Sequence, residues 1–440
     1  MAKFQNEPLS LKAFFLGLTF FLSFIFNVQT VQAATLTHGA VLGALSDSSV
    51  KVWIRTDSDG VFKVEYKLTT DSYPGIITSG VSLEGSTDYT GVIQLAGLTA
   101  NTTYDYRVLV DDVVQAGNGS SGTFTTLPVS GGACHYVFST VGDFSSTYVS
   151  PGDFSFADIL NTATPLFNLF NGDQIYGPST GTKSDIEAYY QNNWASSSWK
   201  TFTKNTPSVF MWDDHEMPLS DNWDGGKSGQ YSLYRQVADE YQFSNNFTPK
   251  VPGETYFSFN VCDTSFFIAD TRSYRSLDTE AIDSTSLRML GTAQMAHLKN
   301  WLKNNSAKFK FILFSTSTSD TNTSPGDTYV SYKSERKDLY DFMKLNNIKN
   351  VLVLSGDQHQ MTVNKNLISP THAYYEFNAT PFGSNPIGTG SFSGPDLVCK
   401  DTVGGYRYGF VNVDTTLGTP QVNWKGYRVV NGGADVVVCN

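Results

Sequence analysis

Residues 208–216 read SVFMWDDHE, an apolar run followed by three acidic groups around one histidine. A short apolar run of this kind predicts a buried strand, and the polar residues after it predict a loop at its carboxyl end. Residues 166–176 (LFNLFNGDQIY) and 351–359 (VLVLSGDQH) have the same build. Because functional side chains concentrate on loops held by rigid strands, we expect these three stretches to form one metal-ion site.

Length and charge limit the kinds of protein that this chain can be. Its 440 residues indicate two domains, and 40% hydrophobic with 16% charged residues excludes wholesale disorder. The formal net charge of −11, with no basic patch, argues against a nucleic-acid-binding protein. An anionic substrate must therefore be attracted locally, by metal ions or by a few arginines.

The first 33 residues have the pattern of a secretory signal peptide. Lys3 and Lys12 precede the apolar residues 13–26, and residues 31–33 offer small side chains at the cleavage spacing. An uncleaved membrane anchor is the alternative, but the apolar stretch is shorter than the roughly 20 residues that a membrane span needs. We expect a secreted or periplasmic protein with no membrane span after cleavage.

Four cysteines, an even number in an exported chain, allow two disulfides. They are Cys134, Cys262, Cys399 and Cys439, and no C-x-x-C motif occurs among them, which argues against a zinc knuckle. Three pairings are possible. We take Cys399–Cys439 with Cys134–Cys262 as the working hypothesis, and the sequence leaves the choice open.

The patterning of the chain changes near residues 127–132. Residues 35–126 contain short alternating strands separated by turn residues, which predicts a small all-β sandwich similar to fibronectin type III. In residues 132–440, apolar strands alternate with helical stretches, which predicts a layered α/β domain. Strands are expected at 135–140, 166–171, 208–212, 265–269, 309–314 and 350–355, and helices at 289–302 and 335–345.

A two-metal hydrolytic site needs oxygen and nitrogen ligands on rigid strand ends, a ligand that bridges the ions and a proton donor. Taken alone, a Gly-Asp pair after a strand is usually a turn or a helix cap. The repeated appearance of such groups after apolar strands favours a shared site instead. The candidates are Asp143, Asp173, Tyr176, Asp214, His215, Asn222, Asp357 and His359.

Four motifs together resemble the PhoD-type alkaline phosphatases and phosphodiesterases of the calcineurin-like metallophosphatase superfamily. They are GDQIY at 172–176, WDDHE at 212–216 followed by NW at 222–223, DTRSYR at 270–275 and SGDQH at 355–359. The resemblance extends from the start of the expected sandwich to the late 300s. It implies a metallophosphatase domain of layered β-sheets flanked by helices and preceded by the small all-β sandwich.

The resemblance also implies the metal ligands. Asp173 is expected to bridge two ions, and Tyr176 to bind a ferric ion as a phenolate. Asp214, helped by Asn222, is expected to bind the second ion, while Asp357 and His359 close the site. Since oxygen ligands dominate, hard cations are favoured over an all-nitrogen zinc site. We expect two or more ions, Fe³⁺ and Ca²⁺, with Mg²⁺, Mn²⁺ and Zn²⁺ as alternatives.

One position departs from the family pattern. PhoD-type enzymes commonly carry a cysteine just after the first catalytic strand, where this chain has Val141-Gly142-Asp143. Cys134 precedes that strand and is expected at its opposite end. Asp143 is therefore predicted to supply the ligand, as in other metallophosphatases.

The expected activity is hydrolysis of a small phosphate monoester or diester, with a phospholipid or a nucleotide as possible substrates. The resemblance implies that a metal-bound hydroxide would attack phosphorus, that His215 would protonate the leaving group and that Arg272 would bind the phosphate.

Two other readings compete with this prediction. One is a non-catalytic secreted binding protein with a degenerate metallophosphatase domain. The other is a serine hydrolase, because residues 177–181 (GPSTG) match G-x-S-x-G. A nucleophile elbow, however, needs a strand directly before this motif and a helix directly after it.

Overall fold

The computed structural model describes residues 33–144, 156–218, 229–276, 287–321, 327–384, 392–430 and 435–440. The predicted signal peptide lies outside these residues except for Ala33, and residues 34–440 group into a single unit. Among the described residues, no helix has both the length and the apolar character that a membrane span requires.

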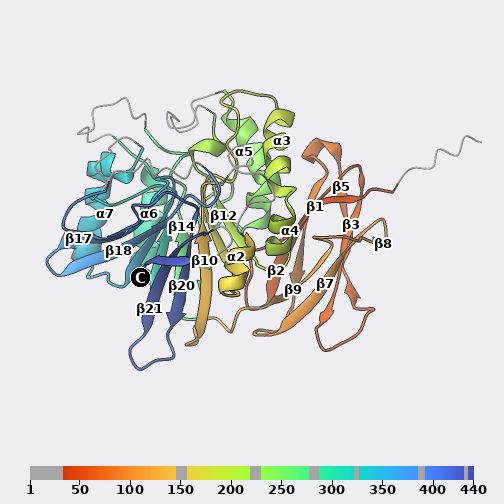
Figure 1. Cartoon of the computed structure of the whole chain (residues 1–440), viewed down its shortest axis with the longest axis horizontal. Helices are drawn as coiled ribbons and strands as arrows, with labels where there is room; N and C mark the ends of the chain where they lie inside the picture. Colours follow the sequence, from red (N-terminus) through yellow and green to blue (C-terminus); the bar gives the residue numbers. More distant parts are fainter. Residues whose placement is uncertain are drawn as a thin grey trace, which may run out of the picture. The chain divides into compact units, whose positions relative to one another are not determined.

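A nine-stranded sheet runs through the molecule in the order β22-β21-β20-β10-β11-β12-β1-β2-β6. Its central strands β10, β11 and β12 are parallel. The C-terminal strand β20 lies beside β10, and β21 lies beside β20 (Figure 1). The bounds are β1 (Leu36–Gly43), β2 (Ser49–Thr56), β6 (Thr90–Ala96), β10 (His135–Val141), β11 (Asn168–Asn171), β12 (Ser208–Met211), β20 (Arg407–Asp414), β21 (Gln421–Arg428) and β22 (Val436–Cys439).

A seven-stranded sheet has the order β13-β14-β15-β16-β18-β17-β19. Its inner face packs on the first sheet, since the Phe138 ring of β10 lies 5.5 Å from the rings of both Phe266 and Phe311. The bounds are β13 (Phe257–Val261), β14 (Thr264–Ile268), β15 (Lys310–Leu313), β16 (Val351–Ser355), β17 (Met361–Ser369), β18 (His372–Ala379) and β19 (Leu397–Lys400).

Helices cover the outer faces of both sheets, which explains the continuous apolar runs in the strands. In β16, Leu352 and Leu354 point into the core between the sheets, whereas Val351 and Val353 point toward the helices. Strands buried on both faces need no polar alternation. The described helices are α2 (Phe156–Thr162), α3 (Lys183–Trp194), α4 (Ser197–Thr203) and α5 (Tyr231–Tyr241) on the nine-stranded sheet, and α6 (Gly291–Asn304) and α7 (Lys333–Leu345) on the seven-stranded sheet.

The predicted fold class is confirmed, and each of the six strands predicted for the catalytic part is present with bounds that differ by three residues or fewer. The two predicted helices correspond to α6 and α7. The sequence pattern did not locate α3, although Thr182 and Asp185 form a capping box at its start.

The N-terminal strands form a sandwich that shares a sheet with the catalytic part. Its second layer is a six-stranded sheet, and its first layer, β1-β2-β6, continues the nine-stranded sheet through the parallel pair Gly43 and Ser208. The strands of the second layer are β3 (Gly60–Leu68), β4 (Ile76–Ile77), β5 (Val81–Leu83), β7 (Thr103–Val110), β8 (Val113–Val114) and β9 (Ser121–Thr125).

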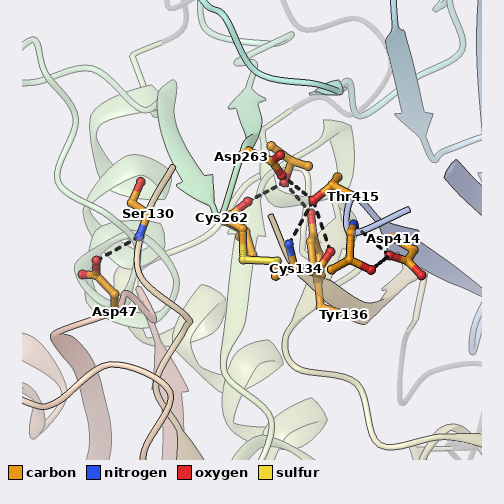
Figure 2. Close-up of a disulfide and its surroundings, with 11 residues drawn as sticks. Asp47, Ser130, Cys134, Tyr136, Cys262, Asp263, Asp414 and Thr415 are labelled. Carbon is orange, nitrogen blue, oxygen red and sulfur yellow. Dashed lines mark hydrogen bonds between the residues drawn. A yellow bond between two sulfur atoms is a disulfide. The ribbon is translucent and has the colours of Figure 1, made fainter. Parts of the chain in front are cut away.

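Two disulfides link the sheets and follow the working hypothesis. Cys134, before β10, pairs with Cys262 in the turn between β13 and β14 (Figure 2). Around this bond, Thr415 donates to Asp263, and Tyr136 and Thr264 share a hydrogen bond. The second disulfide, Cys399–Cys439, joins the edge strands β19 and β22.

Trp53 fixes the N-terminal strands to the catalytic helices. From β2 its ring lies 5.0 Å from Trp194 of α3 and 5.5 Å from Tyr241 of α5, and its indole nitrogen donates to the Glu240 carbonyl at 2.7 Å. Trp53 is fully buried, so this contact is part of the core.

We expect Trp53→Ala to lower the free energy of unfolding by about 3–5 kcal/mol, because it opens a large cavity between β2 and the helices. Residues 34–440 should still unfold in one transition, measured by urea denaturation followed by fluorescence and circular dichroism. Val114→Ala, at an exposed position of β8, is the matched control and should change stability by less than about 0.5 kcal/mol. Two separate transitions, with only the first shifted, would contradict this account.

Candidate metal centre

The acidic groups identified in the sequence meet where β10, β11, β12 and β16 end. Asp143 follows β10, Asp173 follows β11, Asp214 follows β12, and Asp357 and His359 follow β16. Three groups have potential ligand atoms that all lie within 4.8 Å of one another: Asp143 with Asp173 and His359, Asp173 with Asp214 and His215, and Asp213 with Asp214 and Asp357. Asp173 belongs to two groups, and so does Asp214.

Tight turns bring these side chains together. Asp143, Asp173, Asp357 and His359 have positive φ values of 56°, 51°, 69° and 47°. For non-glycine residues this conformation costs about 1–3 kcal/mol each and is characteristic of functional sites. The glycine before Asp173 is required sterically, because a Cβ on Gly172, whose φ is 98°, would lie 2.6 Å from Asp213 Cβ.

Asn171 forms a hydrogen bond between the two large sheets beside the cluster. Its Nδ2 donates to the Ser355 carbonyl at 3.0 Å, and its Oδ1 accepts a hydrogen bond from Thr140 Oγ1 at 3.0 Å. The ends of β10, β11 and β16 are therefore held by one buried amide. Its neighbour Gly356 must stay small, because a Cβ there would lie 2.8 Å from the Asn171 carbonyl oxygen.

Glu216 links two of the loops through hydrogen bonds to its carboxylate. Its carboxylate accepts hydrogen bonds from the backbone nitrogens of Asp173 at 3.1 Å and Asp213 at 2.8 Å, and from Gln242 Nε2 at 3.1 Å. It thereby joins the loop after β11 to the loop after β12. Its role is to shape the loops that carry the clustered carboxylates.

Several carboxylate oxygens in the cluster have no hydrogen-bond donor among the described residues. They are Oδ2 of Asp143, Oδ2 of Asp173 and Oδ2 of Asp213, all buried. A buried carboxylate oxygen without a partner is costly, and a cation at this position would compensate it. The donor set, oxygens with few imidazoles, fits hard metal ions.

Burial of like charges changes the titration of the cluster. Burial raises the pKa of Asp143 to about 8, and the charges of Asp213 and Asp214 act in the same direction. Burial likewise raises the pKa of Glu216 to about 8. The pKa values of Asp173 and Asp357 are raised well above the usual range, by burial first and by neighbouring aspartates second.

Two aromatic residues lie over the cluster. The Tyr176 hydroxyl and His359 Nε2 are 2.8 Å apart, and the Tyr176 ring stacks on His215 with centroids 3.9 Å apart. His215 Nε2 lies 3.5 Å from Asp214 Oδ2, and about a third of its side chain is exposed to solvent. His215 is thus the clustered imidazole that a ligand from solvent can reach, whereas His359 is buried.

Arg272 is fully buried beside the cluster. It donates to Asp213, to Asp214 Oδ1 at 3.3 Å and, through both terminal nitrogens, to Asp327 at 2.6 and 2.7 Å. Burial acts to lower the pKa of Arg272, but the charges of Asp213 and Asp214 outweigh it and raise the pKa well above its ordinary value. Arg275 contacts the same Asp327, so this carboxylate joins both arginines.

The structure brings together the predicted residues that it describes, and Asn222 lies outside the described residues. Sequence reasoning assigned no role to Asn171 or Asp327, because the partners of these side chains lie far away along the chain. Cys134 lies at the opposite end of β10 from the cluster and is disulfide-bonded. Asp143 therefore occupies the position after β10 where PhoD-type enzymes commonly carry a cysteine. Ser179 is exposed in an irregular segment between β11 and α3, and a strand–turn–helix elbow is absent from this described segment.

Comparisons with known proteins show what the chain is similar to in sequence and in fold. A family described as PhoD-like phosphatase matches residues 145–437, and a domain of unknown function (DUF7800) matches residues 33–126. A solved structure of PhoD has 18% sequence identity and a TM-score of 0.74, covering 93% of each chain. A purple acid phosphatase from yellow lupin (Lupinus luteus) seeds has 13% identity and a TM-score of 0.61, covering 91% of this chain and 72% of its own. No curated protein matches the chain.

We expect the chelated protein to lose stability as the pH rises from about 4 to about 8. The pKa values of Asp143 and Glu216 are about 8 in the folded state against ordinary values of 3.8 and 4.5, so the folded state binds more protons in this range. Their stabilising contribution is complete below the unfolded pKa values and is lost as the pH passes through the folded values.

Thermal denaturation in chelator at several pH values measures this dependence. Metal-loaded protein is the control, and its melting temperature should change less because bound cations replace the protons. A chelated protein that becomes more stable toward pH 8 would contradict the buried-charge account.

Proposed function

The chain belongs to the PhoD-like phosphatase family and is a phosphoric ester hydrolase, and we propose that it is exported and uses at least two metal ions to hydrolyse small phosphate esters. The observation that carries the metal proposal is the group of buried carboxylate oxygens without donors, together with His359 and Tyr176.

The residues fit two neighbouring cation positions. Asp143, Asp173 and His359 would hold the first ion together with the Tyr176 phenolate, and Asp173 would bridge to the second ion. Asp214 would bind that second ion with Asn222, and Asp357 would complete the site. The oxygen-rich set favours Fe³⁺ and Ca²⁺, with Mg²⁺, Mn²⁺ and Zn²⁺ as alternatives.

When bound, such ions would lower the pKa of a coordinated water to make a nucleophile and would neutralise phosphoryl charge. His215 is positioned to donate a proton to the leaving alkoxide, because its ring is fixed by stacking on Tyr176 and remains open to solvent. The resemblance implies that Arg272 binds the phosphate, but its guanidinium is fully buried and already donates to Asp213, Asp214 and Asp327, so direct contact with a phosphate would require these bonds to rearrange. Its bonds to Asp213 and Asp214 also support a role in orienting those carboxylates.

Export and substrate range are further parts of the proposal. Two disulfides are expected in an oxidising compartment, which supports a secreted or periplasmic location. The family implies small phosphoester substrates, and monoesters, diesters, phospholipids and nucleotides are all candidates. The serine hydrolase alternative is disfavoured, because Ser179 lies outside any nucleophile elbow.

The test is a panel of phosphate monoesters and diesters with metal analysis of the same preparation. We expect hydrolysis to vanish on chelation, to return on addition of metal and to be insensitive to serine-directed reagents. Metal-loaded protein that hydrolyses none of the esters would favour the non-catalytic binding protein. Inactivation by a serine-directed reagent would favour the serine hydrolase.

We expect His215→Ala to lower kcat by about 10²–10⁴, because it removes the proton donor. The metal content should not change, and steady-state kinetics with elemental analysis measure both. His135→Ala, at an exposed position of β10, is the matched control and should retain full activity. If the His215→Ala variant loses both metal and activity, His215 is a metal ligand instead. If the variant keeps its metal and hydrolyses the ester as fast as the original protein, His215 is not the general acid.

A further inference from the structure

Arg407 lies in the C-terminal strands and contacts the backbone of loops next to the metal centre. It begins β20, and only 2% of the residue is exposed. Its guanidinium donates to Asp401 Oδ2 at 3.0 Å and to the Val403 carbonyl at 2.6 Å. It also donates to the carbonyls of His359 and Thr380, each at 3.3 Å.

The carbonyls of His359 and Thr380 belong to two loops that position candidate metal ligands. His359 itself belongs to the group with Asp143 and Asp173. The loop that begins at Thr380 is hydrogen-bonded to the backbone at Asp143. The backbone N–H of Phe382 donates to the Gly142 carbonyl at 2.9 Å, and that of Gly383 donates to the Asp143 carbonyl at 3.0 Å. One guanidinium therefore connects the backbone supports of Asp143 and His359.

Arg407 has an ion-pair partner outside the metal centre. Asp401, only 5% exposed, accepts hydrogen bonds from Arg407 and, at 2.8 Å, from Arg428 of β21. Asp401 therefore holds the planar guanidinium of Arg407 in place while its other nitrogens donate to backbone carbonyls. An ammonium group on a lysine at this position could not reach all four acceptors together, because it lacks the planar arrangement of donors.

We propose that Arg407 is a positioning residue that keeps Asp143 and His359 at the separation needed to hold a multivalent cation between Asp143, Asp173 and His359. His359 has a φ of 47°, a conformation that persists only when its surroundings impose it, and the bond to its carbonyl is one such constraint. The inference rests on the proposed function, because it concerns the same metal centre. It assigns part of that centre to the C-terminal strands.

The test is titration of metal-free protein with Mn²⁺, followed by calorimetry and by electron paramagnetic resonance. We expect Arg407→Lys to weaken one of two Mn²⁺ equivalents by at least about 10-fold, the size typical for groups that orient metal ligands, while the other changes by less than about threefold. Activity should fall at limiting Mn²⁺ and recover as Mn²⁺ approaches saturation.

Arg428→Lys is the matched control, since it alters the same Asp401 without touching either carbonyl. It should leave both Mn²⁺ affinities within about threefold of the original values. If Arg407→Lys does not fold, Asp401→Asn provides the same readout, because it removes the charge that holds the guanidinium in place. Equal Mn²⁺ binding by the original protein and the folded variant, whatever their melting temperatures, would overturn the inference.

The two proposals fail in different ways. An original protein that binds two Mn²⁺ ions but hydrolyses no phosphate ester would refute the proposed function and leave the role of Arg407 to be decided by the titration. A hydrolytic protein whose Arg407→Lys variant binds both ions normally would refute the positioning role alone.

Discussion

The concentration of buried carboxylates at the ends of β10, β11, β12 and β16 is the constraint on which the rest of the structure depends. The negative charges of Asp213 and Asp214 add to burial in raising the pKa values of Asp143, Asp173 and Asp357. Burial makes each negative charge more costly, so the set requires positive charge or protons. Arg272 compensates Asp213 and Asp214, and backbone N–H groups satisfy Glu216. The Oδ2 atoms of Asp143 and Asp173 still lack a hydrogen-bond donor among the described residues, and a cation beside them would compensate their charge.

Such a cluster is stable only on a stiff scaffold. Parallel strands buried on both faces supply it, because their side chains interdigitate with the opposite sheet and with the helices at the same time. Asn171 then links the two sheets directly beside the cluster. The left-handed conformations of Asp143, Asp173 and Asp357 are maintained by this packing, and they turn the carboxylates toward a common centre.

Segments far from the cluster in sequence contribute to the same scaffold. Trp53 joins an N-terminal strand to α3 and α5, which cover the face of the sheet that carries Asp173 and Asp214. Arg407 of β20 donates a hydrogen bond to the backbone carbonyl of His359 in the cluster. The sandwich and the C-terminal strands are therefore integral to the packing around the site, and the disulfides join the two large sheets outside it.

The sequence by itself determined the strands that lead to the site and the acidic residues that end them. Their apolar runs and Gly-Asp turns are local signals, which express burial on both faces and backbone geometry within a few residues. The same local motifs identified the family. Only the tertiary structure decided that Asp327 pairs with Arg272, that Asn171 bonds across the sheets to Ser355, and that Cys134 joins Cys262. These partners are separated by 55, 184 and 128 positions in the chain. Pairing over such distances leaves no periodic trace in sequence, because it arises from how the sheets and loops meet in space.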